Sequence, residues 1–309
     1  MSVSVLGIDT SNYTTSLSVC EDGAIVRNVK IPLKVQKGGV GLRQSDAVFS
    51  HTVNLPEAFE QLGYDLKNIS AVGYSDRPRG VQGSYMPCFL CGKSAAAAVS
   101  AALGVKTYCN SHQEGHIRAA VYSSGMPEYE RFYAYHISGG TLELLTVTVK
   151  EDSYDCSITG RTLDVTAGQI IDRTGVMLGL DFPCGRALQE LSLKNCDPLP
   201  PVKVCVSGCD CNLSGVQNKA EQLFKDGAPH PLIAAYVIEY IRKTIDKMTR
   251  SALEAEKLPL LFSGGVASNI TLKEYFTKEY GAYFASPEFS SDNAAGTALL
   301  TYRKVINGE

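Results

Sequence analysis

The stretch VSVLGIDTSNYTTSLSVCEDGAIVRNVKIPL, residues 3–33, decides the fold. Apolar residues alternate at Val3, Val5 and Ile8, and hydroxyl and amide side chains follow at 9–16. Residues 17–33 then resume the extended pattern around a Glu-Asp-Gly turn. Alternation with a period of two predicts half-buried strands. We therefore expect a strand, a polar hairpin tip and two further strands.

A second copy of this layout follows near the middle of the chain. RFYAYHI at 131–137 predicts a strand, SGGT at 138–141 a tip, and LELLTVTV at 142–149 another strand. Helical patterns come after each copy, among them the Ala-rich segment 89–104 and the long amphipathic segment 230–256. Ser291 and Asp292 precede a final Ala-rich run and predict a capped helix. The sequence therefore predicts two related α/β units.

Composition limits the class of protein. A chain of 309 residues that is 44% hydrophobic can bury a large core and suggests about two domains. No apolar run approaches the roughly 20 residues of a membrane span. The opening MSVSVLGID has no signal-peptide pattern, so we expect a cytoplasmic protein with reduced cysteines. The net charge of -3 argues against a broad basic surface for nucleic acid.

His112 and His116, in HQEGHI, lie four residues apart and would share one face of a helix. Gln113 stands where a zinc-protease motif has glutamate, with the acid one place later at Glu114, which argues against a peptidase. A carboxylate from elsewhere would complete a two-histidine, one-carboxylate site typical of Fe(II) or Zn. Two ordinary surface histidines are the alternative, and the motif alone favours neither.

Three turns of small residues, 9–16, 138–141 and 263–269, could hold phosphate oxygens through backbone N–H groups. Tight turns between strands use the same residues, and that interpretation is favoured for any one of them. Cys88 and Cys91 form a Cys-x-x-Cys pair, but no matching second pair indicates a zinc ribbon, so we expect buried thiols. The loop DRPRG at 76–80 either contacts phosphates or is a solvated basic loop.

The order of six segments resembles the TsaD (Gcp) family of tRNA N6-threonylcarbamoyladenosine synthases over nearly the whole chain. They are LGIDTSNYTTSLSV, HQEGHI, SGGT, TLDVTAGQIIDRTGVMLGLDFPCG, SGGVASN and FSSDNAAGTAL. The resemblance implies an α/β fold of the ASKHA type, the duplicated two-lobed fold of actin-like ATPases, with a nucleotide between the lobes. We expect lobes at 1–125, joined by the terminal helix 292–309, and at 126–291.

The same resemblance implies the site. His112, His116 and Asp292 would bind one divalent ion, Fe or Zn, and Asp9 and Asp172 are candidate catalytic carboxylates. Candidate contacts to substrate or nucleotide are Ser11, Ser138, Gly139, Gly140, Asp172, Gly185, Gly264, Gly265 and Asn269.

The implied reaction transfers a threonylcarbamoyl group from threonylcarbamoyl-AMP to N6 of adenosine 37 in tRNA. ATP or AMP, with Mg, is an implied ligand, and TsaB-like and TsaE-like proteins are implied partners. No membrane is involved, and the net charge supports tRNA binding weakly.

The chain departs from the family pattern near the expected reaction centre. Asn12 and Tyr13 stand where the family has acidic residues, Thr141 directly follows Gly140 without the family's histidine, and Gln169 replaces a glutamate. Two alternatives therefore stay open. One is an O- or N-carbamoyltransferase that acts on a small molecule. The other is a non-catalytic TsaB-like partner, which would not need three metal ligands.

Overall fold

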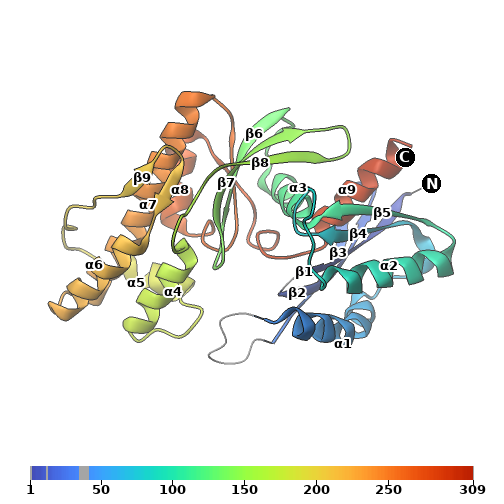
Figure 1. The fold of residues 1–309 in the computed structure, drawn as a ribbon, viewed down its shortest axis with the longest axis horizontal. Helices are drawn as coiled ribbons and strands as arrows, with labels where there is room; N and C mark the ends of the chain where they lie inside the picture. Colours follow the sequence, from blue (N-terminus) through green and yellow to red (C-terminus); the bar gives the residue numbers. More distant parts are fainter. Residues whose placement is uncertain (1, 12, 35–41, 309) are drawn as a thin grey trace. The chain divides into compact units, whose positions relative to one another are not determined.

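The computed structural model describes residues 2–11, 13–34 and 42–308, and the chain divides into two compact units (Figure 1). Unit 1 comprises residues 1–123, 149–155 and 288–309, and unit 2 comprises residues 124–148 and 156–287. Each unit contains a five-stranded sheet. The chain therefore starts in unit 1, builds unit 2, and returns to unit 1 for its last helix.

The two sheets share one topology. The sheet of unit 1 has the order β3-β2-β1-β4-β5, and that of unit 2 has the matching order β8-β7-β6-β11-β12. In both, the first strand pairs antiparallel with the second and parallel with the fourth. This repeat confirms the predicted duplicated α/β fold. The strands are β1 (Ser4–Ser11), β2 (Thr14–Glu21), β3 (Ala24–Pro32), β4 (Ile69–Arg77), β5 (Lys106–Ser111), β6 (Arg131–Ile137), β7 (Leu142–Val149), β8 (Tyr154–Arg161), β11 (Leu260–Ser263) and β12 (Tyr283–Phe284).

The helices connect these strands. Unit 1 contains α1 (Gln44–Leu62), the short η1 (Leu66–Asn68), α2 (Phe89–Leu103), α3 (His112–Ser124) and α9 (Ala295–Ile306). Unit 2 contains α4 (Ala167–Met177), α5 (Gly185–Ser192), α6 (Ser214–Lys225), α7 (His230–Ala255) and α8 (Ile270–Tyr280), with a small hairpin of β9 (Cys205–Ser207) and β10 (Asp210–Asn212). In the described part of the chain, none of these helices is long and apolar enough to cross a membrane.

Helices cover both faces of the unit 1 sheet (Figure 1). Leu6 and Ile8 of β1 pack with α1 and α2 in one buried cluster. Successive strand residues face opposite sides of the sheet, so Gly7 faces the other side, and α9 packs against that side. A Cβ atom at Gly7 would stand 2.6 Å from the carbonyl oxygen of Ala294, so the glycine permits the close approach of α9.

The core of unit 2 forms around α7, the helix predicted at 230–256. Tyr133 and Tyr135 of β6 are buried, and their hydroxyl groups contact α7. The Tyr133 hydroxyl donates to the carbonyl oxygen of Ala252 over 3.0 Å, and the Tyr135 hydroxyl lies 3.0 Å from Oγ1 of Thr249. Large aromatic side chains thus fill the core while their polar ends remain hydrogen-bonded.

The predicted polar hairpin tip at 9–16 is wrong in extent. Strand β1 continues to Ser11 and β2 begins at Thr14, and Asn12 lies outside the described residues. Several of these polar side chains are buried and hydrogen-bonded: Thr10 Oγ1, for example, donates to the carbonyl oxygen of Cys88 over 2.9 Å. Hydrogen bonding removes the cost of burying these hydroxyl groups.

The predicted cap of the last helix is also wrong. Helix α9 has Ala294 as its N-cap residue, with no hydrogen bond from that side chain. Asn293 Oδ1 instead accepts from the backbone N–H of Ala295 over 3.0 Å. Asp292 is therefore not used as a cap, because its carboxylate interacts with histidines of α3.

Helices α3 and α9 contact each other through two glycines. A Cβ atom at Gly296 would stand 1.8 Å from the carbonyl oxygen of Gly115, so the two backbones touch. A Cβ atom at Gly115 would itself lie 3.2 Å from Oγ1 of Thr297. This contact joins the helix that carries His112 and His116 to the start of the helix that follows Asp292.

We predict that Gly296→Ala lowers the free energy of unfolding by up to about 2 kcal/mol. Overpacked backbones must separate, which costs about 1–3 kcal/mol, and the higher helix propensity of Ala offsets roughly 1 kcal/mol of this cost. Urea denaturation measures the change. Gly80→Ala is the control, since a Cβ atom there meets nothing within 4 Å. A Gly296→Ala chain as stable as the parent would contradict the proposed contact.

Candidate metal centre

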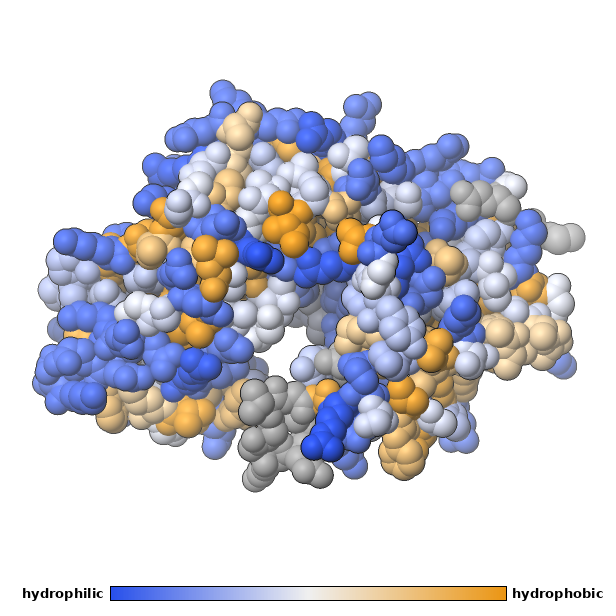
Figure 2. All heavy atoms as spheres, in the orientation of Figure 1, coloured by the Kyte–Doolittle hydropathy of each residue, from blue (hydrophilic) through white to orange (hydrophobic). Residues whose placement is uncertain are grey.

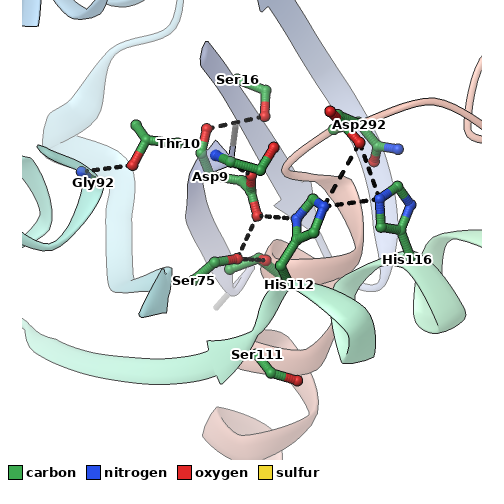
Figure 3. Close-up of polar contacts among 12 residues, drawn as sticks. Asp9, Thr10, Ser16, Ser75, Gly92, Ser111, His112, His116 and Asp292 are labelled. Carbon is green, nitrogen blue, oxygen red and sulfur yellow. Dashed lines mark hydrogen bonds and ion pairs between the residues drawn. The ribbon is translucent and has the colours of Figure 1, made fainter. Parts of the chain in front are cut away.

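The end of the unit 1 sheet gathers polar side chains from four segments (Figure 3). Asp9 comes from β1, Ser75 from β4, and His112 and His116 from the first turns of α3. Asp292 comes from the loop before α9. The fold thus brings together residues that lie up to 283 positions apart in the sequence.

A capping box fixes the start of α3. Ser111 Oγ accepts from the backbone N–H of Glu114 over 3.3 Å, and Glu114 Oε2 accepts from the backbone N–H of Ser111 over 2.8 Å. Glu114 is buried and therefore serves as a structural partner of the helix end. The helix begins at His112, so His112 and His116 are four residues apart on one helix and their imidazoles share one face.

Three donor atoms converge on one point. Nε2 of His112 lies 2.9 Å from Nε2 of His116 and 3.6 Å from Oδ1 of Asp292, and His116 Nε2 lies 3.1 Å from the same Oδ1. An ion about 2.0–2.2 Å from each donor, in octahedral or tetrahedral geometry, requires neighbouring donors about 2.8–3.6 Å apart. The donor set fits one divalent ion and leaves further coordination positions open.

Asp9 contacts Nδ1 of His112, the ring nitrogen that does not face the other two donor atoms. Its Oδ2 lies 2.9 Å from Nδ1 of His112 and accepts from the Ser75 hydroxyl, while its Oδ1 accepts from the backbone N–H of Ser11 over 2.9 Å. An ionised carboxylate only accepts, so Nδ1 carries a proton, and Nε2 is left as the ring atom that would bind an ion beside the other two ligand atoms. Asp9 is 1% exposed. Its contacts orient His112.

The charges of the cluster favour a cation. Burial would lower the pKa of His112, but Asp9 and Asp292 outweigh burial and raise this pKa to about 10. Burial would raise the pKa of Asp292, but hydrogen bonds and charge from His112 and His116 hold it well below its usual value. Two ionised carboxylates thus flank His112 and stabilise positive charge, whether a proton or a metal ion.

Unit 2 contains a second cluster, made of the glycine-rich turns. The predicted residues Ser138, Gly139 and Gly140 join β6 to β7, and Thr166 at the start of α4 donates its hydroxyl to the carbonyl oxygen of Gly139 over 2.7 Å. Gly264 has a φ of 98° and packs against Ile137, where a side chain would collide with the backbone. The turn at 138–140 therefore lies against the start of α4, and the turn at 264–265 lies beside the end of β6.

Asp172, Gly185 and Asn269 are joined to one another through α5. Asp172 Oδ1 accepts from the backbone N–H of Cys184 over 2.8 Å, directly before Gly185. Asn269 caps α8, and the neighbouring Ile270 N–H donates to Gln189 of α5 over 2.8 Å. Burial raises the pKa of Asp172 despite the hydrogen bond from Cys184.

Other sequence predictions concern the cysteines and the basic loop. All ten cysteines are free, and burial raises the pKa of Cys88 to about 12, which fits an unreactive thiol.

Arg77 forms an ion pair with Asp76, its neighbour in the chain. Ser75 and the Ser111–Glu114 capping box were not predicted. A serine inside a buried strand segment, and Ser-x-x-Glu before a helix, were the signals available.

A sequence model of the family described as "tRNA N6-adenosine threonylcarbamoyltransferase" (TsaD) matches residues 26–299. Two curated proteins with this name are similar to the chain. One from Thermus thermophilus is 32% identical over 314 residues, covering 98% of this chain and 94% of the relative. The one from Carboxydothermus hydrogenoformans is 28% identical over 326 residues, covering 99% and 93%.

Solved structures share the fold. Component A of (R)-2-hydroxyglutaryl-CoA dehydratase from Acidaminococcus fermentans has a TM-score of 0.59 and 16% identity, and the match covers 98% of this chain and 99% of that one. HypF from T. kodakarensis has a TM-score of 0.60 and 12% identity, and the match covers 98% of this chain and 48% of HypF. These likenesses confirm the predicted ASKHA type of fold.

We predict that the purified chain binds about one Zn or Fe ion, and that His112→Ala or Asp292→Ala abolishes stoichiometric binding, because each removes one of three donors. Asp9→Asn should weaken binding by about 10- to 100-fold, since it loses the anion that orients His112. Metal analysis by mass spectrometry measures the content. The control is His230→Ala, which changes an exposed histidine. Equal metal content in all four variants would exclude this site.

Metal affinity should increase with pH. An ion must displace the proton on His112, whose pKa is raised to about 10 by Asp9 and Asp292 against the effect of burial. Below that pH, the release of one proton per ion raises the apparent affinity about tenfold per pH unit. Dissociation constants from chelator competition at pH 6 and pH 8, corrected for the protonation of the chelator, should therefore differ by about 100-fold. An affinity that does not change over this range would contradict the protonation of His112.

Proposed function

The chain belongs to the tRNA N6-adenosine threonylcarbamoyltransferase (TsaD) family, and we propose that it transfers a threonylcarbamoyl group from threonylcarbamoyl-AMP to N6 of adenosine 37 in tRNA. The observation that carries the proposal is the convergence of His112, His116 and Asp292 on one point. A non-catalytic relative would not need this donor set. The family match alone would not distinguish an active member from one that has lost its site.

His112, His116 and Asp292 would hold the divalent ion, which is Fe or Zn in this proposal. A bound ion would supply a Lewis acid for the carbonyl oxygen of the carbamoyl group. Asp9 would act through His112, since its three hydrogen bonds and its burial leave it no access to substrate. We therefore assign Asp9 a positioning role in place of the catalytic role expected from the sequence.

The unit 2 cluster would bind the adenylate part of the donor, or ATP or AMP with Mg. Backbone N–H groups of the turns at 138–140 and 264–265 suit phosphate oxygens, because glycines allow close approach. Asp172 uses Oδ1 for the N–H of Cys184, so its Oδ2 would accept from a hydroxyl group of the nucleotide or acceptor. Gly185 and Asn269 border Asp172 through α5, and Ser11 of unit 1 stays a proposed contact.

A TsaB-like protein is proposed as a partner, together with a TsaE-like one, and the cytoplasm as the location. Apolar side chains are exposed on α1 and α2, as the tan and orange spheres over these helices show (Figure 2). Phe49 is 71% exposed and Val53 57% exposed. A groove of about 590 Å³ between the two helices is lined largely by apolar residues, including Leu55, Phe59 and Leu90. Such a face supports contact with another protein.

A small-molecule acceptor is the alternative, and the net charge of -3 favours it over tRNA bound by this chain alone. O- or N-carbamoyl transfer to a small hydroxyl or amine would use the same donor chemistry. The metal and adenylate sites would then be unchanged. The identity of the acceptor therefore decides between the two functions.

Product analysis tests the proposal. The chain is incubated with tRNA, ATP, threonine, bicarbonate, the enzyme that forms the adenylate, and TsaB-like and TsaE-like proteins. We expect threonylcarbamoyl-adenosine in digested tRNA by mass spectrometry. His116→Ala should reduce it more than about 100-fold through loss of a metal donor.

Two results would contradict the proposal. Product on an added small acceptor, with none on tRNA, would support the alternative function. Unmodified tRNA in a mixture where a known family member forms the product would exclude activity on that tRNA. His230→Ala should retain full activity as the control.

A further inference from the structure

The metal ligand Asp292 lies in a loop that has no regular secondary structure. His112 and His116 are held by helix α3, but Asp292 lies between β12 and α9. The chain leaves unit 2 at Pro287 and returns to unit 1 at Glu288, four residues before Asp292. The position of this carboxylate therefore depends on side chains that contact the loop 288–293.

Lys30 of β3 makes two of these contacts. Its Nζ donates to the backbone carbonyl oxygen of Glu288 over 2.7 Å and lies 3.3 Å from Oγ of Ser291. β3 is the edge strand of the unit 1 sheet, so Lys30 joins the loop to the rigid sheet. The two contacts fix the loop at the residue where it enters unit 1 and at the residue next to Asp292.

Asn293 and Phe289 make further contacts that shape the loop. Nδ2 of Asn293 donates to the carbonyl oxygens of Phe289 and Ser291, over 3.3 and 2.6 Å. The ring of Phe289 lies edge-on to Tyr122 of α3, with centroids 5.6 Å apart. Asn293 shapes the loop internally and Tyr122 contacts it from the helix that carries the histidines. Lys30 contributes the hydrogen bonds from the sheet.

We propose that Lys30 is a positioning residue that holds Asp292 in ligating geometry. This inference rests on the proposed metal site. A hydrogen bond from a charged donor is stronger than a neutral one, but it contributes less when the donor is part-exposed, as Lys30 is here. Loss of the two Lys30 contacts should therefore weaken metal binding by about three- to tenfold, because ordering the loop then opposes binding.

The test measures Co²⁺ binding by visible absorption and chelator competition. Lys30→Met removes the donors and keeps a long side chain. We expect its dissociation constant to increase about three- to tenfold and its absorption bands to shift, because the Asp292 oxygen is less well fixed. Lys30→Arg should restore both properties toward those of the parent, since a guanidinium can donate to the same oxygens.

The control is Lys67→Met, which makes the same change of charge at an exposed lysine of η1. Urea denaturation of the metal-free proteins should show equal stability for the Lys67 and Lys30 variants. Co²⁺ affinity and spectra of Lys30→Met that equal those of the parent would overturn the inference while leaving the metal site intact. A parent chain that binds no Co²⁺ would instead overturn the metal site, and the role of Lys30 with it.

Discussion

The backbone contact between Gly115 of α3 and Gly296 of α9 is the constraint on which the candidate site depends. It occurs because neither helix has a side chain at the crossing point, so the two backbones touch. His116 follows Gly115 directly, and Asp292 precedes Gly296 by four residues. Any separation of the helices would therefore move the imidazoles away from the carboxylate. The sheet also fixes the position of α9, since Gly7 and Gly73 let this helix lie close to β1 and β4.

The electrostatics of the site follow from this packing. Asp9 and Asp292 both contact His112, one at each ring nitrogen, in a place largely withdrawn from water. Without a cation, the arrangement retains a proton on the imidazole, which is the meaning of its raised pKa. A divalent ion would also compensate the two carboxylates and would use the lone pair that the proton occupies. Proton and metal would thus compete for one position, and the carboxylates favour positive charge there.

The sequence predicts regular elements well because local pattern specifies them. The strand at 131–137 and the long helix starting at His230 are confirmed, and the repeat of strand order confirms the duplicated fold. The hairpin tip was predicted too long because polar residues usually indicate turns. The hydroxyl of Thr10 instead donates to the carbonyl oxygen of Cys88 before α2, and that of Ser16 to the carbonyl oxygen of Asp9 in β1, and no local pattern reveals these contacts.

Local sequence patterns predict less of the site than of the fold. The spacing of His112 and His116 indicated a shared face, but the third donor came from the family resemblance and not from spacing. Ser75, Lys30 and the Gly115–Gly296 contact join segments far apart in the chain, so they appear only in three dimensions. The roles of the unit 2 turns remain predictions, supported by the packing of Gly139 against α4 and of Gly264 against Ile137 of β6.

The most direct test of the central claim is anomalous diffraction from crystals of the metal-loaded chain, recorded at the absorption edge of the bound metal. The account predicts one strong peak about 2.0–2.2 Å from Nε2 of His112, Nε2 of His116 and a carboxylate oxygen of Asp292, with Asp9 outside the coordination sphere. A peak bound elsewhere, or one that excludes the Asp292 carboxylate, would contradict it.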